Sequence, residues 1–116
     1  MKLESESDYV DGHNARNREL VRQIIAKGVN PSSPRVLDIF FNSPSQAAGT
    51  SLAVALQALG MTGTEVRPHT DASRTWSVES HPQATVDYMV NPSVTLELVQ
   101  IAAKYGSEYD GWATLL

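Results

Sequence analysis

Apolar side chains recur at helical spacing in three segments of the chain. The first segment covers residues 14–28 and carries a stripe made of Leu20, Val21, Ile24 and Ile25. The second, residues 44–59, is rich in alanine and leucine, and the third covers residues 91–106. Apolar positions three and four residues apart lie on one side of a helix. The pattern therefore predicts three amphipathic helices.

Two of these helices begin with residues that are typical of helix starts. Ser43 precedes Pro44, and Gln46 follows the serine by three residues, which is the spacing of a capping box. Asn91 precedes Pro92 in a similar way. Proline is common at the first helical position, where its missing N–H would have no partner within the helix. We therefore expect Ser43 and Asn91 to be the N-terminal caps.

Four further segments carry the β-branched, aromatic and alternating patterns of strands. They are residues 35–41, 64–69, 74–80 and 108–116. With the first helix set aside, the elements follow the order strand–helix–strand–strand–helix–strand. This order predicts an α+β fold, a ferredoxin-like two-layer sandwich (βαββαβ) with an antiparallel sheet and an extra N-terminal helix. We expect residues 1–13 to form a flexible N-terminal lead and residues 14–116 to form a single domain.

Composition and charge narrow the class of protein. A chain of 116 residues is large enough to bury one hydrophobic core that needs no disulfide or metal to stabilise it. The absence of cysteine excludes disulfides and thiolate chemistry. The formal net charge of −4 disfavours broad binding to a phosphate backbone and suits a basic protein surface. The start of the chain lacks the profile of a secretory signal, and no apolar run approaches the roughly 20 residues of a membrane span. We expect a cytoplasmic protein.

The sequence offers little for catalysis or cofactor binding. His13, His69 and His81 are not spaced as metal ligands, so we expect solvated histidines and neither a metal nor another cofactor. No nucleophile elbow or phosphate-binding loop is present. Asp38 and Asp110 could serve acid–base chemistry if adjacent strands brought them together. Carboxylates on a sheet more often lie on a solvent-exposed face and take no part in catalysis. We therefore expect that the protein is not an enzyme.

The end of the chain carries the most specific motif. The segment "LVQIAAKYGSEYDGW", together with "VLDIFFNSPSQAA", "TEVRP" and a W-x-V strand, resembles the family of the regulator of ribonuclease activity B over about residues 14–114. The resemblance implies a sandwich with an added N-terminal helix. It also implies a protein that binds ribonuclease E and lowers its processing of RNA, with no catalysis of its own. The implied partner is thus ribonuclease E or a related nuclease.

One face of the predicted sheet is expected to be free of the two principal helices. Strict alternation in the last strand places Asp110 and Trp112 on that face, and the neighbouring first strand offers Asp38 and Phe40 there. Phe40 and Trp112 would then form an aromatic patch bordered by Asp38, Asp110 and Glu79. Aromatic anchors with a polar rim are typical of protein interfaces. These five residues are our candidates for partner binding.

Other interpretations of this face remain open. The first helix could lie across it and turn the two aromatic rings into a second small core, or a second copy of the chain could contact it. A small-molecule-binding domain or minor enzyme could use the same face, because fold alone does not fix function. Exposed sheet aromatics also bind single-stranded RNA, although the acidic neighbours make this less favourable.

Overall fold

The computed structural model describes residues 6–71 and 73–115, which form four helices and two sheets. The helices are α1 (Glu6–Ala26), α2 (Gln46–Ala58), α3 (Val86–Met89) and α4 (Pro92–Lys104). The strands are β1 (Arg35–Val36), β2 (Asp38–Ser43), β3 (Glu65–Pro68), β4 (Trp76–Ser80), β5 (Gln83–Ala84) and β6 (Glu108–Ala113). None of the helices in these ranges is both long and apolar enough to cross a membrane.

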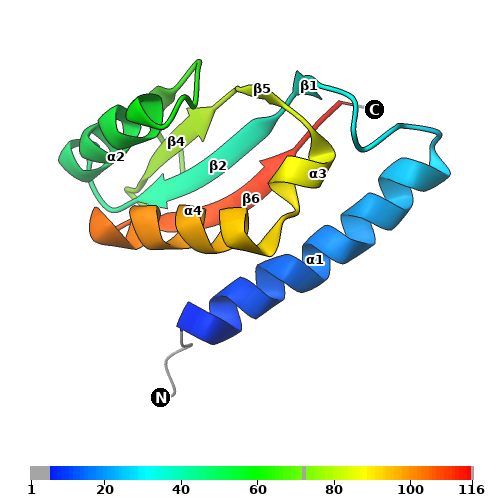
Figure 1. Cartoon of the computed structure of the whole chain (residues 1–116). Coiled ribbons are helices and arrows are strands. Elements are labelled where there is room, and N and C mark those ends of the chain that lie inside the picture. Colours follow the sequence, from blue (N-terminus) through cyan, green and yellow to red (C-terminus); the bar gives the residue numbers. More distant parts are fainter. Residues whose placement is uncertain (1–5, 72, 116) are drawn as a thin grey trace.

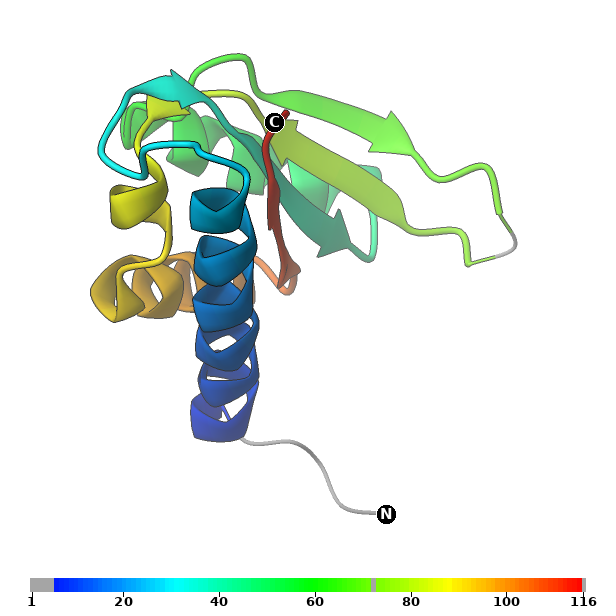
Figure 2. The same ribbon diagram turned by 90° about the vertical axis from the view of Figure 1, so that its right-hand side faces the viewer.

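The larger sheet has the strand order β3-β4-β2-β6, and every neighbouring pair is antiparallel. β1 and β5 form a separate two-stranded ladder. α2 contacts β2, β3 and β4, whereas α4 contacts β6 and α2 on the same side of the sheet (Figure 1). α1 contacts α4 and lies beside it at the β6 edge (Figure 2). The arrangement confirms the predicted α+β class with an antiparallel sheet.

Alternate residues of β2 divide the sheet into a buried and a partly exposed face. Ile39, Phe41 and Ser43 are buried, whereas the residues between them are only partly buried. α2 packs closely on the buried face. A Cβ added at Gly49 of α2 would lie 3.1 Å from Val66 Cγ1 and 3.3 Å from Val78 Cγ2. The alanine-rich helix therefore lies close on the sheet, as its small side chains predict.

The predicted cap of the second helix is wrong, whereas that of the third is confirmed. α2 is capped by Ser45, whose side chain accepts a hydrogen bond from the backbone of the first turn. Ser43 instead ends β2 and makes a buried 2.7 Å hydrogen bond with the Ser107 hydroxyl. A serine lies on each side of Pro44. Because β2 continues to Ser43, the helix begins only after the second serine, Ser45. α4 begins at Pro92 after its cap Asn91, as predicted.

The N-terminal helix begins earlier than predicted. Residues 6–13 were expected in the polar lead but form the start of α1, while residues 1–5 of that lead lie outside the described residues. Tertiary contacts explain the difference. The backbone carbonyl of Tyr109 accepts hydrogen bonds from the Tyr9 hydroxyl and from His13 Nε2, the latter at 3.1 Å. His13 is therefore a buried residue that stacks near Tyr109, not a solvated one.

Candidate protein-binding face

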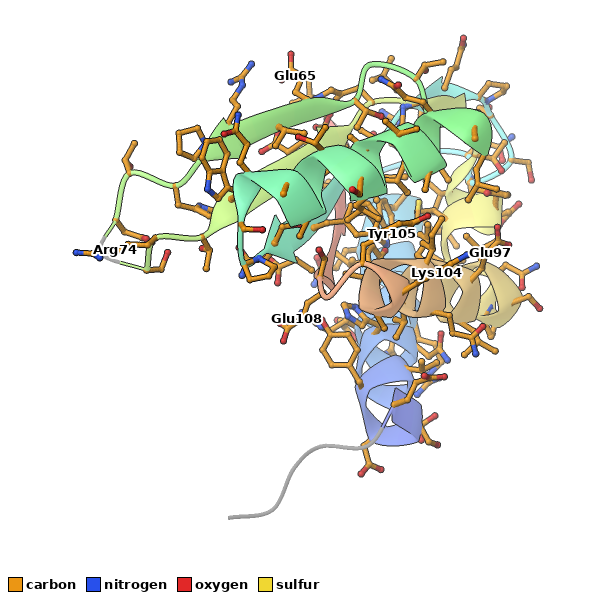
Figure 3. All side chains as sticks on the ribbon, turned by 90° about the vertical axis from the view of Figure 1, so that its left-hand side faces the viewer. Glu65, Arg74, Glu97, Lys104, Tyr105 and Glu108 are labelled. Carbon is orange, nitrogen blue, oxygen red and sulfur yellow. The ribbon has the colours of Figure 1, made fainter. Side chains whose placement is uncertain are left out.

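The open face is the side of the larger sheet opposite α2 and α4. Cross-strand partners share a face, so the register identifies its members. Phe40 pairs with Glu79 on one side and with Gly111 on the other, and Glu79 pairs with Glu65. Further pairs extend the face: Asp38 with Ala113, Asn42 with Glu108, and Arg67 with Ser77. Glu65 and Glu108 belong to the two edge strands (Figure 3).

The expected placement of Trp112 beside Phe40 is wrong. Phe41 pairs with Tyr109, but Phe40 pairs with Gly111, so Asp110 is an extra residue in β6. Such a bulge shifts the alternation by one residue, and every later side chain changes face. Trp112 therefore pairs with Ile39 and lies on the buried face.

Gly111 lies next to the bulge and has φ +123°, a conformation that disfavours residues with a Cβ. Strict alternation along the strand would instead place Gly111 on the buried face and Trp112 on the open face. The bulge carries the large indole of Trp112 into the core and leaves the glycine on the open face.

α1 covers Trp112 and fixes it in the core. Trp112 is 9% exposed, and its indole N–H donates a 2.8 Å hydrogen bond to Asn17 Oδ1. Leu20 and Ile24, from the predicted apolar stripe of α1, line a small hollow next to the ring. The alternative in which the first helix lies across the open face and buries both aromatic rings is therefore wrong, since α1 covers Trp112 on the buried face and leaves Phe40 on the open face. Trp112 is not available to a partner in this conformation.

Phe40 stays on the open face and is only partly buried. Its neighbour Gly111 has no side chain, and a Cβ added there would meet nothing within 4 Å. The side chains of Asp38 and Glu79 on the same face are 36% and 34% exposed. Asp110 is exposed at the bulge on the β6 edge. Four of the five predicted residues therefore remain accessible, with one aromatic ring in place of two.

Acidic groups dominate the open face. The carboxylates of Asp38, Glu65 and Glu79 lie on its central and outer strands. Arg67 makes a 2.7 Å ion pair with Glu65, and both side chains are well exposed. His81 follows β4 and donates from Nδ1 to Asp38 Oδ1 at 2.7 Å. A surface of this charge suits a basic partner.

The register does not support an acid–base pair. Asp38 pairs with Ala113, three residues along β6 from Asp110. The two carboxylates that could have worked together are therefore separated by the strand pairing.

Sequence reasoning missed Asn17, Glu65 and His81. Asn17 lies three residues before Leu20 and so continues the buried side of α1. It was missed because the helix face was predicted from apolar residues alone, and asparagine is polar. Glu65 lies in the segment predicted as the second strand, residues 64–69, but nothing in the sequence indicated which residue it would face. His81 lies two residues after Glu79, and this spacing was the available signal that both share one face of an extended strand.

Comparison with known proteins gives one family match. The family model described as "Regulator of ribonuclease activity B" matches residues 14–114, which is nearly the whole chain. Among curated proteins, no match is found. The matched range includes β2, α2, α4 and the bulged strand β6. The chain therefore belongs to the family of the regulator of ribonuclease activity B.

Proposed function

We propose that this protein regulates a ribonuclease by binding it through the open face, without catalysis of its own. The family match over residues 14–114 is the observation that carries the proposal. The target we propose is ribonuclease E or a related nuclease of RNA processing and decay, with inhibition as the outcome. Such a target would place the protein in the cytoplasm.

The chemistry of the open face supports a basic protein surface as its partner. Phe40 would be the aromatic anchor, and Asp38, Glu79 and Asp110 would form the rim. Anchors of this kind contribute most of the binding energy when a partner desolvates them, whereas charged rims mainly steer association and set specificity. The same carboxylates would repel RNA phosphates, which disfavours the RNA-binding alternative.

We also infer that the sheet is of the ferredoxin-like type. The strand order β3-β4-β2-β6, with antiparallel neighbours throughout, supports this assignment. So does the placement of α2 between β2 and β3 and of α4 between β4 and β6 along the chain. In this topology one sheet face is left without the two connecting helices, which is the face that we assign to the partner.

Binding of purified ribonuclease E to the immobilised chain tests the proposal. Phe40→Ala should weaken binding at least tenfold, which corresponds to about 1.4 kcal/mol, and should relieve inhibition of RNA cleavage in parallel. Tyr88→Ala is the matched control, because Tyr88 is 43% exposed and lies on α3, away from the open face. Circular dichroism would verify that both variants are folded.

Two outcomes would contradict different parts of the proposal. Equal binding by Phe40→Ala and the unmodified chain would remove the open face as the docking surface. No binding to ribonuclease E at low or moderate salt would remove this nuclease as the target. Glu79→Lys offers a second probe, because charge reversal on the rim should slow association and reduce its dependence on salt.

A further inference from the structure

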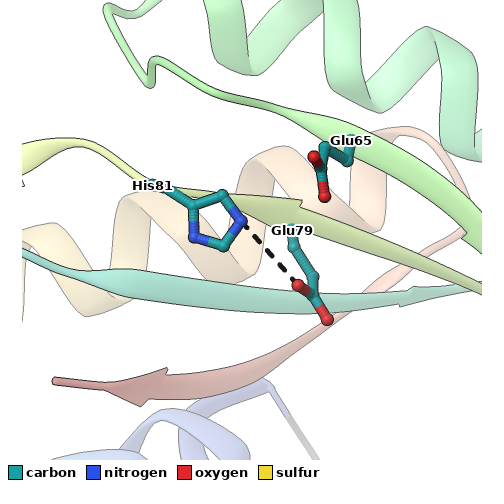
Figure 4. A group of neighbouring side chains, drawn as sticks. All are labelled: Glu65, Glu79 and His81. Atoms are coloured by element: carbon teal, nitrogen blue, oxygen red, sulfur yellow. Dashed lines mark ion pairs between the residues drawn. The ribbon is translucent and has the colours of Figure 1, made fainter. Parts of the chain in front are cut away.

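We propose that Glu65, Glu79 and His81 form a binding site for a divalent transition-metal ion of the Zn²⁺ class. Each residue offers one ligand atom, and these three atoms lie within 4.8 Å of one another. They come from β3, from β4 and from the residue that follows β4, and they converge above the open face (Figure 4). This proposal does not depend on the proposed function.

The set of donor atoms selects the class of metal. One imidazole nitrogen and two carboxylate oxygens are ligands that Zn²⁺ accepts, with water completing a tetrahedron. Ca²⁺ and Mg²⁺ prefer sites made of oxygen atoms alone and need more of them. The imidazole of His81 therefore distinguishes this group from an ordinary acidic surface cluster.

The ring of His81 has the orientation of a metal ligand. Its Nδ1–H donates to Asp38 Oδ1 at 2.7 Å, because an ionised carboxylate can only accept. In the neutral imidazole, which is the form that binds metals, this bond places the hydrogen on Nδ1 and leaves the lone pair of Nε2 for the ion, as in carboxylate–histidine–zinc arrangements. The distance from Nε2 to Glu79 Oε2 is 3.8 Å, which is too long for a hydrogen bond. It is close to the roughly 3.4 Å between two ligands of a tetrahedral Zn²⁺.

The backbone holds His81 on both sides. Its N–H donates to the Thr62 carbonyl at 2.8 Å, and the carbonyl of the next residue, Pro82, accepts from Leu37 N–H at 2.9 Å. A Cβ added at Gly63 would lie 3.3 Å from His81 Cβ, so the loop after α2 packs directly against the histidine. A ligand fixed in this way loses little freedom when it binds an ion.

The strand register brings the two glutamates together without the help of a metal. Glu65 and Glu79 are directly opposite each other in the antiparallel β3–β4 pair. Like charges in that position destabilise a sheet. Arg67 offsets part of this repulsion through Glu65, but its side chain is 68% exposed, and exposed pairs of this kind contribute little. A divalent cation would bridge both carboxylates and stabilise the folded chain by mass action.

Calorimetric titration of the full chain with ZnCl₂ tests the site. We expect one ion per chain with a dissociation constant in the micromolar range, and at least tenfold weaker binding of Mg²⁺. His81→Ala and Glu79→Gln should each weaken Zn²⁺ binding at least tenfold. His69→Ala is the matched control, because His69 is an exposed histidine that bonds to Asn42 and does not belong to the group. Circular dichroism would establish that each variant is folded.

Several results would overturn the proposal. They are the absence of Zn²⁺ binding, unchanged affinity in both His81→Ala and Glu79→Gln, and an equal loss in His69→Ala, which would indicate adventitious binding by surface histidines. Co²⁺ provides a second measurement, since its visible absorption bands should appear with the unmodified chain and be lost in His81→Ala. No nuclease is present in these experiments, so their failure is distinguishable from failure of the proposed function.

Discussion

The hydrogen bond between Trp112 and Asn17 joins α1 to the bulged strand, and its removal should be costly. Trp112 Nε1 donates to Asn17 Oδ1 at 2.8 Å, and both residues are buried. Asn17→Ala leaves the indole N–H in the core without its partner. Trp112→Phe removes that N–H together with part of the ring. The double variant removes both ends of the bond at once, which permits a double-mutant cycle.

The structure sets the expected magnitudes. Leaving one buried partner unsatisfied costs about 1–3 kcal/mol of unfolding free energy. We expect about 2 kcal/mol for Asn17→Ala, which also loses a longer bond of 3.3 Å to Thr95 Oγ1. Trp112→Phe should cost about 2–3 kcal/mol because it also gives up buried apolar volume. The double variant should fall short of the sum by about 1 kcal/mol, because the shared bond is lost only once.

Urea unfolding followed by far-ultraviolet circular dichroism measures all four proteins with one probe. Tryptophan fluorescence is unsuitable, because one of the two tryptophans is replaced. The exposed pair of Glu19 and Arg22 on α1 provides a control cycle, whose coupling should stay below about 0.5 kcal/mol. Costs for Asn17 and Trp112 that add to within about 0.3 kcal/mol, or a near-zero cost for Trp112→Phe, would refute the docking of α1 on the indole.

Two further substitutions test the bulge and the buried tyrosine. Gly111→Ala should lower the unfolding free energy by about 1–3 kcal/mol in urea titrations, because φ is +123° although space is available for a Cβ. Gly12→Ala, in open space on α1, is its control and should not destabilise. Tyr109→Phe should raise the unfolding free energy by about 1 kcal/mol near neutral pH, since it removes a buried hydroxyl that has no hydrogen-bond partner among the described residues. Burial raises the pKa of the Tyr109 hydroxyl, so the contribution of the neutral tyrosine to the unfolding free energy is complete below about pH 10. This contribution is lost as the pH rises further, because the unfolded chain then releases the proton more readily than the folded chain. Tyr109→Phe should therefore lose less stability than the unmodified chain above about pH 10, and an equal loss would contradict this explanation.

Local patterns in the sequence were sufficient for most of the elements. The alternation in β2 predicts which of its residues are buried, because side chains of a strand point to opposite faces. Asn91 and Pro92 predict the start of α4, since a cap and a first-turn proline act within a few residues. The same alternation predicted that Phe40, Asp38 and Glu79 lie on one face of the sheet. Each of these features depends on neighbours in the chain or on simple alternation.

The placement of α1 and of Trp112 depends on contacts between distant segments. The helix extends back to Glu6 in the described residues, where Tyr9 and His13 contact the carbonyl of Tyr109 beside the bulge. The buried side of α1 includes two polar residues, His13 and Asn17, which a search for regularly spaced apolar residues does not identify. Their cost of burial is offset by hydrogen bonds to β6. Those partners are close to a hundred residues away in the sequence, so no local pattern predicts the contacts.

The sequence by itself determined the α+β class, the order of the principal helices and the four strands of the larger sheet, and the family resemblance, because these depend on periodicity and on short motifs. Tertiary structure decided which face of the sheet Trp112 occupies and which carboxylates surround His81. The physical reason is the strand register. One extra residue in β6 reverses the faces beyond it, and the pairing of β3 with β4 sets Glu65 against Glu79.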